Sequence, residues 1–345
     1  MITEKNITLR RIINFSGHHF VWITPWSALP VLIFEFTDFH WLAVPWLPIS
    51  LIGTALAFYL GFKNNSSYDR LWEARKIWGS IINSSRSWGS SVKGFVTDQY
   101  TKNPVSDQEL YGIKKRLIHR HIAWIYALRS QLLEVAPWEH ASQGGLVGIF
   151  GRKNRSQKGI GLVNEHESGT ELVNFLPKKE SEELARYKNT ATQIIDRQSE
   201  DLKELSNKGL IDTYRHVELQ AILREFYDHQ GKCERIKKFP FPRQYGNMSI
   251  VFVGLFIFLL PLGMVSEFAK LGDWGVWFSI PFTMIVSWVY VVMELVGDYS
   301  ENPFEGLPND IPMLSLCRTI EIDLKEMLGE TDIPSAIDAK NGVLM

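Results

Sequence analysis

Two pairs of apolar stretches, separated by a long charged middle, restrict what this chain can fold into. A membrane-spanning helix needs about 20 largely apolar residues. Four stretches approach or reach that length: 20–36, 41–62, 249–265 and 274–297. The first contains Pro25 and Pro30, which are tolerated when neighbouring helices satisfy the freed backbone groups. Because only short connections join the members of each pair, the sequence predicts two membrane hairpins and an all-α fold.

The placement of lysine and arginine predicts the orientation of these spans. The two short connections contain a single basic residue, Lys270. Since basic loops stay on the cytoplasmic side, we expect a multi-pass protein of the cell (inner) membrane with both termini in the cytoplasm. The expected organisation is an N-terminal arm (1–19), a first transmembrane hairpin (20–62), a cytosolic helical region (63–248), a second transmembrane hairpin (249–297) and a cytosolic C-terminal segment (298–345).

The middle of the chain carries helical patterns with one interruption. Apolar residues recur at helical spacing over 66–100, 108–136, 177–210 and 212–236. Between the second and third of these, residues 140–176 are rich in glycine and polar side chains. This composition predicts a long loop.

Composition and motifs exclude several classes of function. The net charge is −1, which gives no reason to expect a nucleic-acid partner. The only cysteines are Cys233 and Cys317, too few for a disulfide framework or a cysteine-based metal site. His119 and His121 are two apart on a predicted helix and so point to different faces. With no phosphate-binding glycine loop, zinc-protease motif or serine nucleophile elbow, we expect neither an enzyme nor a cofactor.

The second apolar stretch carries two stripes of residues spaced four apart, which lie on adjacent faces of a helix. The first stripe is Thr54, Phe58 and Phe62, and the second is Gly53, Ala57 and Gly61. Small residues permit close helix approach in membranes, and aromatic faces are most often buried against neighbours. Packing is therefore the interpretation that the pattern favours. The alternative is a pore, in which copies of this helix surround an axis and the first stripe forms stacked rings.

Several motifs resemble those of the bestrophin family in its bacterial branch. They begin with the Phe58–Phe62 segment, continue with the motif residues Tyr68, Arg70, Trp72, Glu73 and Arg75, and end with CERI at 233–236 and ENPFEGLPNDIP at 301–312, which includes Asn302, Pro303 and Phe304. The resemblance covers nearly the whole chain except 140–176. It implies a homopentameric ion channel whose subunits each contribute four spans and a large helical cytosolic region. The expected partners are the lipid bilayer, other copies of the chain and permeant monovalent ions.

The resemblance also assigns pore residues. In the family, three residues spaced four apart on the second span line a narrow neck, which places Thr54, Phe58 and Phe62 there. The outermost ring is Thr54, where the family usually has an apolar residue, so dewetting should be weaker at that level. The family's second constriction, a cytosolic aperture, corresponds to Ile194, with Gln193 or Arg197 as alternatives if the alignment slips. The alternative for Ile194 itself is a place in the core.

Animal bestrophins are opened by Ca²⁺ held around the N-P-F-acidic segment, by oxygen ligands. This chain retains Asn302 and Asp310 but has Tyr299 and Leu307 where an amide and a carboxylate are needed. The resemblance therefore implies a weak or absent Ca²⁺ site, no other metal, and conduction that does not depend on Ca²⁺.

Selectivity is not set by charge at the neck, since none of its three residues is charged. The bacterial branch favours monovalent cations, and the alternative is an anion (chloride) channel of the same architecture. A rival from another class is a membrane-anchored scaffold without conduction. A secondary transporter would show internal symmetry and midplane charges, whereas the acidic residues Glu35 and Glu294 lie near span ends. We expect Glu294 to reach the interface or to cap a neighbouring helix.

Overall fold

The computed structural model describes residues 1–6, 8–39, 41, 43–99, 101, 104–162, 172–272 and 274–345. Within these ranges every regular element is a helix, and extended pairing is limited to isolated bridges near the chain ends. The all-α prediction is therefore confirmed. The chain divides into two compact units. The membrane unit comprises Glu4–Arg70 and Pro240–Asn302, and the polar unit comprises Met1–Thr3, Leu71–Phe239 and Pro303–Met345.

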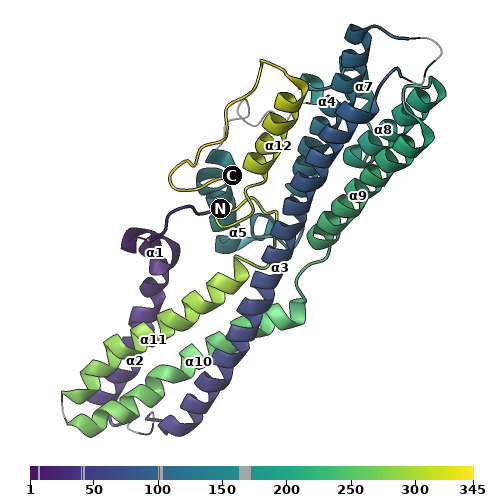
Figure 1. The fold of residues 1–345 in the computed structure, drawn as a ribbon. Coiled ribbons are helices and arrows are strands. Elements are labelled where there is room, and N and C mark those ends of the chain that lie inside the picture. Colours follow the sequence, from purple (N-terminus) through teal and green to yellow (C-terminus); the bar gives the residue numbers. More distant parts are fainter. Residues whose placement is uncertain are drawn as a thin grey trace. The chain divides into compact units, whose positions relative to one another are not determined.

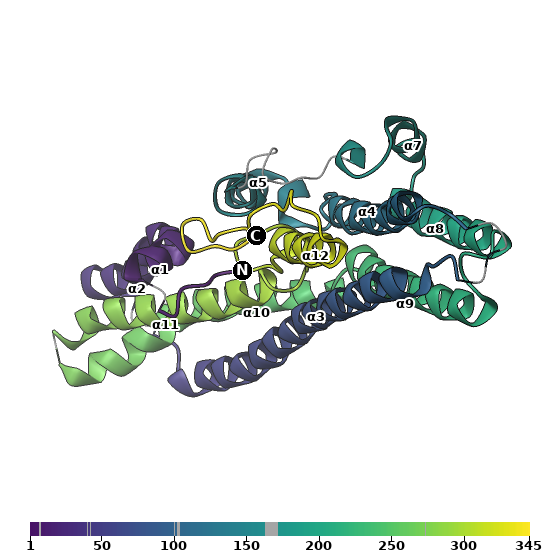
Figure 2. The ribbon, with the colours of Figure 1, turned by 45° about the horizontal axis from the view of Figure 1, so that its top comes forward.

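The membrane unit is built from apolar helices. They are α1 (Leu9–Ser16), α2 (Phe20–Phe36), the first part of α3 (Trp46–Phe95), α10 (Arg243–Phe268) and α11 (Gly275–Asp298). Four helical stretches in the described ranges are long and apolar enough to cross a membrane: Leu9–Phe36, Trp46–Phe95, Arg243–Leu271 and Gly275–Asp298. Helix α11 packs along both α10 and α2, and Figure 2 shows α10 and α11 side by side.

Helix α3 passes through the abrupt change from apolar to polar sequence without a break. It is one helix of 50 residues, Trp46–Phe95, and Figure 1 shows it as a continuous ribbon. After Pro48 in its first turn the helix contains no proline, so nothing removes a backbone donor or clashes with a preceding carbonyl. At 1.5 Å per residue the helix is about 75 Å long, far more than the ~30 Å of a hydrocarbon core.

The polar unit packs the rest of α3 with five further helices around one apolar core. They are α4 (Asp107–Leu132), α7 (Lys178–Leu184), α8 (Thr190–Asn207), α9 (Thr213–Lys238) and α12 (Met313–Leu328). Side-chain caps define several starts, because Ser106, Asn189 and Asp212 each accept a backbone N–H from the first turn of the helix that follows. The Asn189 cap also explains why the predicted helix over 177–210 is interrupted: it begins a new helix after α7.

The segment 140–176 differs from the long loop that was predicted. It contains the helix α5 (Gly145–Lys158) and the 3-10 turns η3 (His140–Ser142), η4 (Ile160–Leu162) and η5 (Leu172–Asn174), while 163–171 lie outside the described residues. The glycines serve close packing here. A Cβ atom at Gly148 would lie 1.8 Å from the carbonyl oxygen of Gln143, and one at Gly151 would lie 2.7 Å from the carbonyl carbon of His140.

A buried histidine makes the stability of the polar unit depend on pH. His121 is 2% exposed among the rings of Trp88, Trp124 and Phe226, and burial lowers its pKa to about 3. The unfolded chain binds this proton below about pH 6.5, whereas the folded chain does not until near pH 3. Stability is therefore fully present above pH 6.5 and falls as the pH drops. We expect a loss of about 2 kcal/mol between pH 7 and pH 5.

The check is the thermal unfolding midpoint of the purified protein in detergent at these two pH values. In His121→Phe, which keeps a ring but cannot bind a proton, the midpoint should depend less on pH. An equal pH dependence in the variant would remove His121 as the cause.

Candidate functional site: the exposed face of α3

The membrane part of α3 has one buried face and one exposed face. Ile49, Leu56 and Leu60 are buried against the other spans. The opposite face consists of Leu47, Leu51, Thr54, Phe58 and Phe62, all exposed and all uncharged. Phe58 and Phe62 are each 67% exposed. Two large aromatic side chains pointing away from their own unit require lipid, a second copy of the chain or a pore axis in front of them.

Close packing at Gly53 fixes which way this face points. A Cβ atom at Gly53 would lie 2.7 Å from the ring of Phe256, and the Tyr290 hydroxyl donates to the Gly53 carbonyl over 2.9 Å. These contacts hold α3 against α10 and α11. The other two residues of the predicted packing stripe are less closely packed within the chain. Ala57 is half-buried, and Gly61 is exposed with open space where its Cβ would be.

Thr54, the outermost of the three predicted neck residues, carries a hydroxyl that already donates a hydrogen bond. The Thr54 hydroxyl donates to the carbonyl of Ser50 over 2.9 Å, one turn earlier in α3. Because the proton points along the helix, the side chain presents its methyl group and oxygen lone pairs to the surroundings. Thr54 can therefore accept a hydrogen bond or contact a cation while keeping its own bond.

A buried ion pair anchors α3 one residue beyond Phe62. The Lys63 ammonium lies 2.5 Å from Glu294 Oε1 and donates to the Ser249 hydroxyl over 2.9 Å, and that hydroxyl also lies 2.9 Å from Glu294 Oε1. Lys63 is 1% exposed. Glu294 is thus the buried partner of a lysine, a role that its sequence position, which suggested the membrane interface or a helix cap, did not predict. The anchor joins α3, α10 and α11 directly behind the exposed face.

The motif residues Tyr68 and Arg70 end the first segment of the membrane unit, and Trp72, Glu73 and Arg75 continue α3 in the polar unit. Tyr68 and Trp72 are exposed, whereas Arg70 and Arg75 are half-buried. The Glu73 carboxylate pairs with the guanidinium of Arg235 in α9 at 2.6 Å. In the polar unit this bond connects the first family motif with the CERI segment that contains Arg235.

Further along α3 a polar pocket of about 390 Å³ opens between α3 and α9. Its lining residues are Ser80, Asn83, Ser84, Glu225, Asp228, His229 and Lys232. The Ser84 hydroxyl donates to Glu225 Oε2 over 2.7 Å and lies 3.1 Å from His229 Nε2. Burial lowers the pKa of His229. The lining carries two carboxylates, Glu225 and Asp228, and one lysine, Lys232, so with His229 neutral its formal net charge is −1, which attracts a cation rather than an anion.

The predicted aperture residue lies in the core of the polar unit. Ile194 is fully buried, as is its neighbour Ile195 at 1% exposure. A side chain enclosed on all sides by its own unit cannot line an opening in this arrangement. Of the two alternatives on α8, Gln193 is half-buried, and Arg197 is half-buried and pairs with Glu183 at 2.9 Å.

The segment after α11 forms a tight polar turn. The Asp310 carboxylate accepts the backbone N–H groups of Phe304, Gly306 and Ile311 at 3.1, 2.9 and 2.7 Å. Phe304 and Gly306 both have positive φ, 73° and 77°. Burial raises the pKa of Asp310, and the three N–H groups oppose that shift. The turn is therefore closed by one buried carboxylate.

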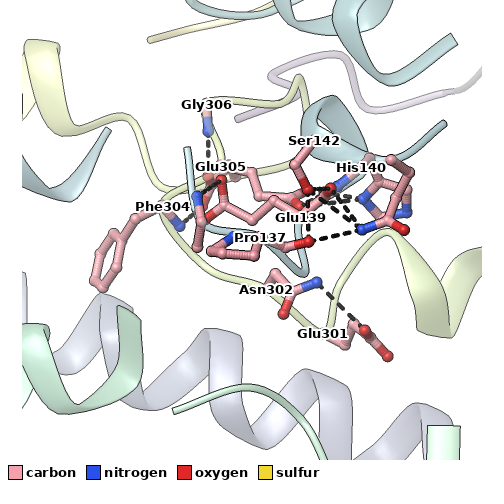
Figure 3. A network of polar contacts seen from close by, with 12 residues as sticks. Pro137, Glu139, His140, Ser142, Glu301, Asn302, Phe304, Glu305 and Gly306 are labelled. Carbon is pink, nitrogen blue, oxygen red and sulfur yellow. Dashed lines mark hydrogen bonds and ion pairs between the residues drawn. The ribbon is translucent and has the colours of Figure 1, made fainter. Parts of the chain in front are cut away.

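The neighbouring acidic side chains also have partners. Glu305 contacts His140 Nδ1 at 2.9 Å (Figure 3). Lys237 donates to Glu139 and to the carbonyl of Phe304. In the membrane unit, the Asn302 amide donates to Glu301 over 3.3 Å, and its buried Oδ1 has no partner among the described residues. Nowhere among the residues that the structure describes are three or more His, Cys, Asp or Glu side chains grouped so that they could hold a metal ion.

A family model described as bacterial/fungal bestrophin protein matches residues 17–326. The chain is a member of the bestrophin family. The match includes three span candidates and residues 17–36 of the first, together with the N-P-F turn and most of the polar unit.

Bestrophin relatives and structures agree with that assignment. A voltage-dependent anion channel-forming protein of Ralstonia nicotianae is 26% identical over 88% of this chain and 86% of its own length. The voltage-dependent anion channel-forming protein YneE of Escherichia coli is 25% identical over 84% of this chain and 79% of its own. A crystal structure of a bacterial bestrophin homologue from Klebsiella pneumoniae covers 91% of this chain and 98% of its own, with 20% identity and a TM-score of 0.71. This bestrophin thus has the fold of that homologue and is a multi-pass membrane protein.

Proposed function

We propose that this bestrophin is an ion channel whose pore is lined by the exposed face of α3. The observation that carries the proposal is the pair Phe58 and Phe62, which point out of the membrane unit while α3 is held from behind at Gly53 and Lys63. Copies of this face around an axis would form three stacked rings, with Thr54 as the third. Rings of apolar side chains restrict ion flow because water leaves such constrictions readily. An enzymatic role has no motif to support it.

The assembly that we propose is a homopentamer in the cell (inner) membrane, with both termini and residues 63–248 in the cytoplasm. The pentamer follows from the family resemblance, and the orientation follows from the basic residues outside the short connections. The uncharged exposed face of α3 is compatible with a position at the centre of such an assembly, where neighbouring copies would shield it from lipid.

We propose anions as the first candidate for the permeant ion. The names of the curated relatives describe anion channel-forming proteins, and this favours the alternative over the cations that sequence analysis preferred. The electropositive edges of the Phe58 and Phe62 rings would attract an anion weakly. A monovalent cation is the second candidate, favoured by the oxygen lone pairs that Thr54 presents once its proton is bonded to Ser50.

The reversal potential measured across a KCl gradient tests whether the channel prefers anions or cations. Purified protein in a planar bilayer should show discrete steps that reverse near the chloride equilibrium potential. Reversal near the potassium equilibrium potential would transfer the assignment to cations and leave the pore intact. Absence of any steps, with protein shown to be inserted, would favour the scaffold.

Conduction should not require Ca²⁺. Calcium binds six to eight oxygen ligands, whereas Asp310 already accepts three N–H groups and Glu305 and Glu139 are paired with His140 and Lys237. Among the buried side-chain oxygens of 301–310, all of them described residues, Asn302 Oδ1 has no hydrogen-bond partner. We expect the same open probability in a Ca²⁺ chelator and in millimolar Ca²⁺. A current that disappears in the chelator and returns with Ca²⁺ would contradict the expectation.

A further inference from the structure

Helix α5 exposes its large apolar side chains and buries its glycines. Leu146, Val147 and Ile149 are 71%, 54% and 54% exposed, whereas Gly148 and Gly151 are buried. The Cβ distances given above show that the glycine face has no room for side chains. The helix is therefore held close to its own unit by its small residues and presents the apolar side chains outward.

Basic residues follow the apolar ones within the same helix. Lys153 lies four residues after Ile149 and seven after Leu146, so these three share one face. Within Gly145–Lys158 there are two lysines, two arginines and no acidic residue. Arg152 donates to the carbonyl of Ala141 and Arg155 to that of Leu133. Lys153 and Lys158 are exposed and can reach an anionic partner.

This combination has one physical use that fits a membrane protein. An apolar face beside lysines is the pattern of helices that lie in the interface of a bilayer, where apolar side chains enter the headgroup layer and lysines contact anionic lipids. The segment that follows α5 is also bonded to a residue close in sequence to a membrane span. Ile160, just after α5, donates its N–H to the carbonyl of Gly306 over 3.1 Å, and Gly306 is eight residues beyond Asp298, where the span α11 ends.

We propose that the exposed face of α5, formed by Leu146, Ile149 and Lys153, docks on the anionic surface of the membrane in which the protein is embedded. The occupant is the lipid headgroup layer. A neighbouring copy of the chain would offer the apolar residues a partner but gives no reason for the lysines. The proposal goes beyond ion conduction and does not depend on it.

The test measures lipid contact directly in the full-length protein. Leu146→Cys and Ile149→Cys, each carrying an environment-sensitive fluorophore, are compared with Tyr214→Cys in α9, which is 87% exposed. Cys233 and Cys317 are buried and should stay unlabelled. The proteins are reconstituted into vesicles of phosphatidylcholine and phosphatidylglycerol, with or without lipids brominated near the headgroup. Bromine should quench the fluorophore at 146 and 149 and leave it unchanged at 214.

Two further measurements separate the possible causes. Lys153→Gln and Lys158→Gln, combined with Ile149→Cys, should lower the ratio of docked to undocked helix about fivefold for each lysine removed. In vesicles of phosphatidylcholine alone, which carry no net charge, the ratio of docked to undocked helix should also fall. Emission shifted to the blue but not quenched by bromine would assign the face to a second copy and overturn the proposal, as would fluorescence at 146 and 149 equal to that at 214.

Discussion

Replacing Phe58 and Phe62 together by alanine should raise the single-channel conductance several-fold. Each phenyl ring is exposed on the face of α3 that we assign to the pore, and in a symmetric assembly every substitution removes one complete ring. The narrow apolar constriction then widens and stays hydrated, so ions cross it with a smaller dehydration penalty. Single substitutions should give intermediate increases. The measurement is single-channel current in planar bilayers under symmetrical KCl.

The matched control is Phe278→Ala. Phe278 lies on α11, is 59% exposed and belongs to the same unit. The substitution therefore removes a phenyl ring from a surface outside the proposed pore. Its conductance should equal that of the natural protein. If Phe58→Ala and Phe62→Ala also leave the current unchanged while the channel still opens, the two residues are packing residues, as the pattern alone favoured.

Breaking the Lys63–Glu294 pair should cause the largest loss of stability. Removing one partner of a buried ion pair leaves an uncompensated charge and costs about 3–5 kcal/mol. Lys63→Met and Glu294→Leu should therefore each lower the unfolding midpoint of the purified protein in detergent. The double variant replaces both charges by apolar side chains of similar volume and should recover most of the loss.

An exposed pair in the same unit supplies the control. Lys270 and Glu267 lie 2.7 Å apart, with side chains 65% and 37% exposed, and such surface pairs contribute about 0–1 kcal/mol. Glu267→Gln should hardly move the midpoint. A double Lys63–Glu294 variant that is less stable than either single one would show that the two side chains act separately.

Local sequence signals predicted the helices that depend on them. The two halves of α3 were predicted as the apolar stretch 41–62 and the helical pattern over 66–100, and they join as one helix because no proline follows Pro48. Helix α12 was missed although Leu316, Ile320 and Leu324 carry the same spacing. Helix α5 was missed because its glycines were taken as loop residues, and the close packing that requires them involves the backbone at His140 and Gln143.

Contacts between distant parts of the chain were beyond the reach of the sequence. Lys63 and Glu294 are 231 residues apart, and no local pattern indicates that they meet. Ile194 shows a different limit, because a core position and an apolar pore constriction both select an aliphatic residue. The exposure of Phe58 and Phe62 likewise required the structure, since a stripe of aromatic residues on a helix has the same spacing whether it is buried or exposed.

The most direct test of the central claim asks whether water and ions reach the α3 face in a conducting channel. Channels carrying Phe58→Cys are opened in a planar bilayer and treated with thiosulfonates of negative and of positive charge, so that one reagent can enter a pore of either selectivity. Ile285→Cys, which is exposed on α11, and the natural protein, whose cysteines are buried, are treated in the same way. We predict an irreversible change of single-channel current in Phe58→Cys alone. An unchanged current in Phe58→Cys, or an equal change in Ile285→Cys, would contradict a pore lined by α3.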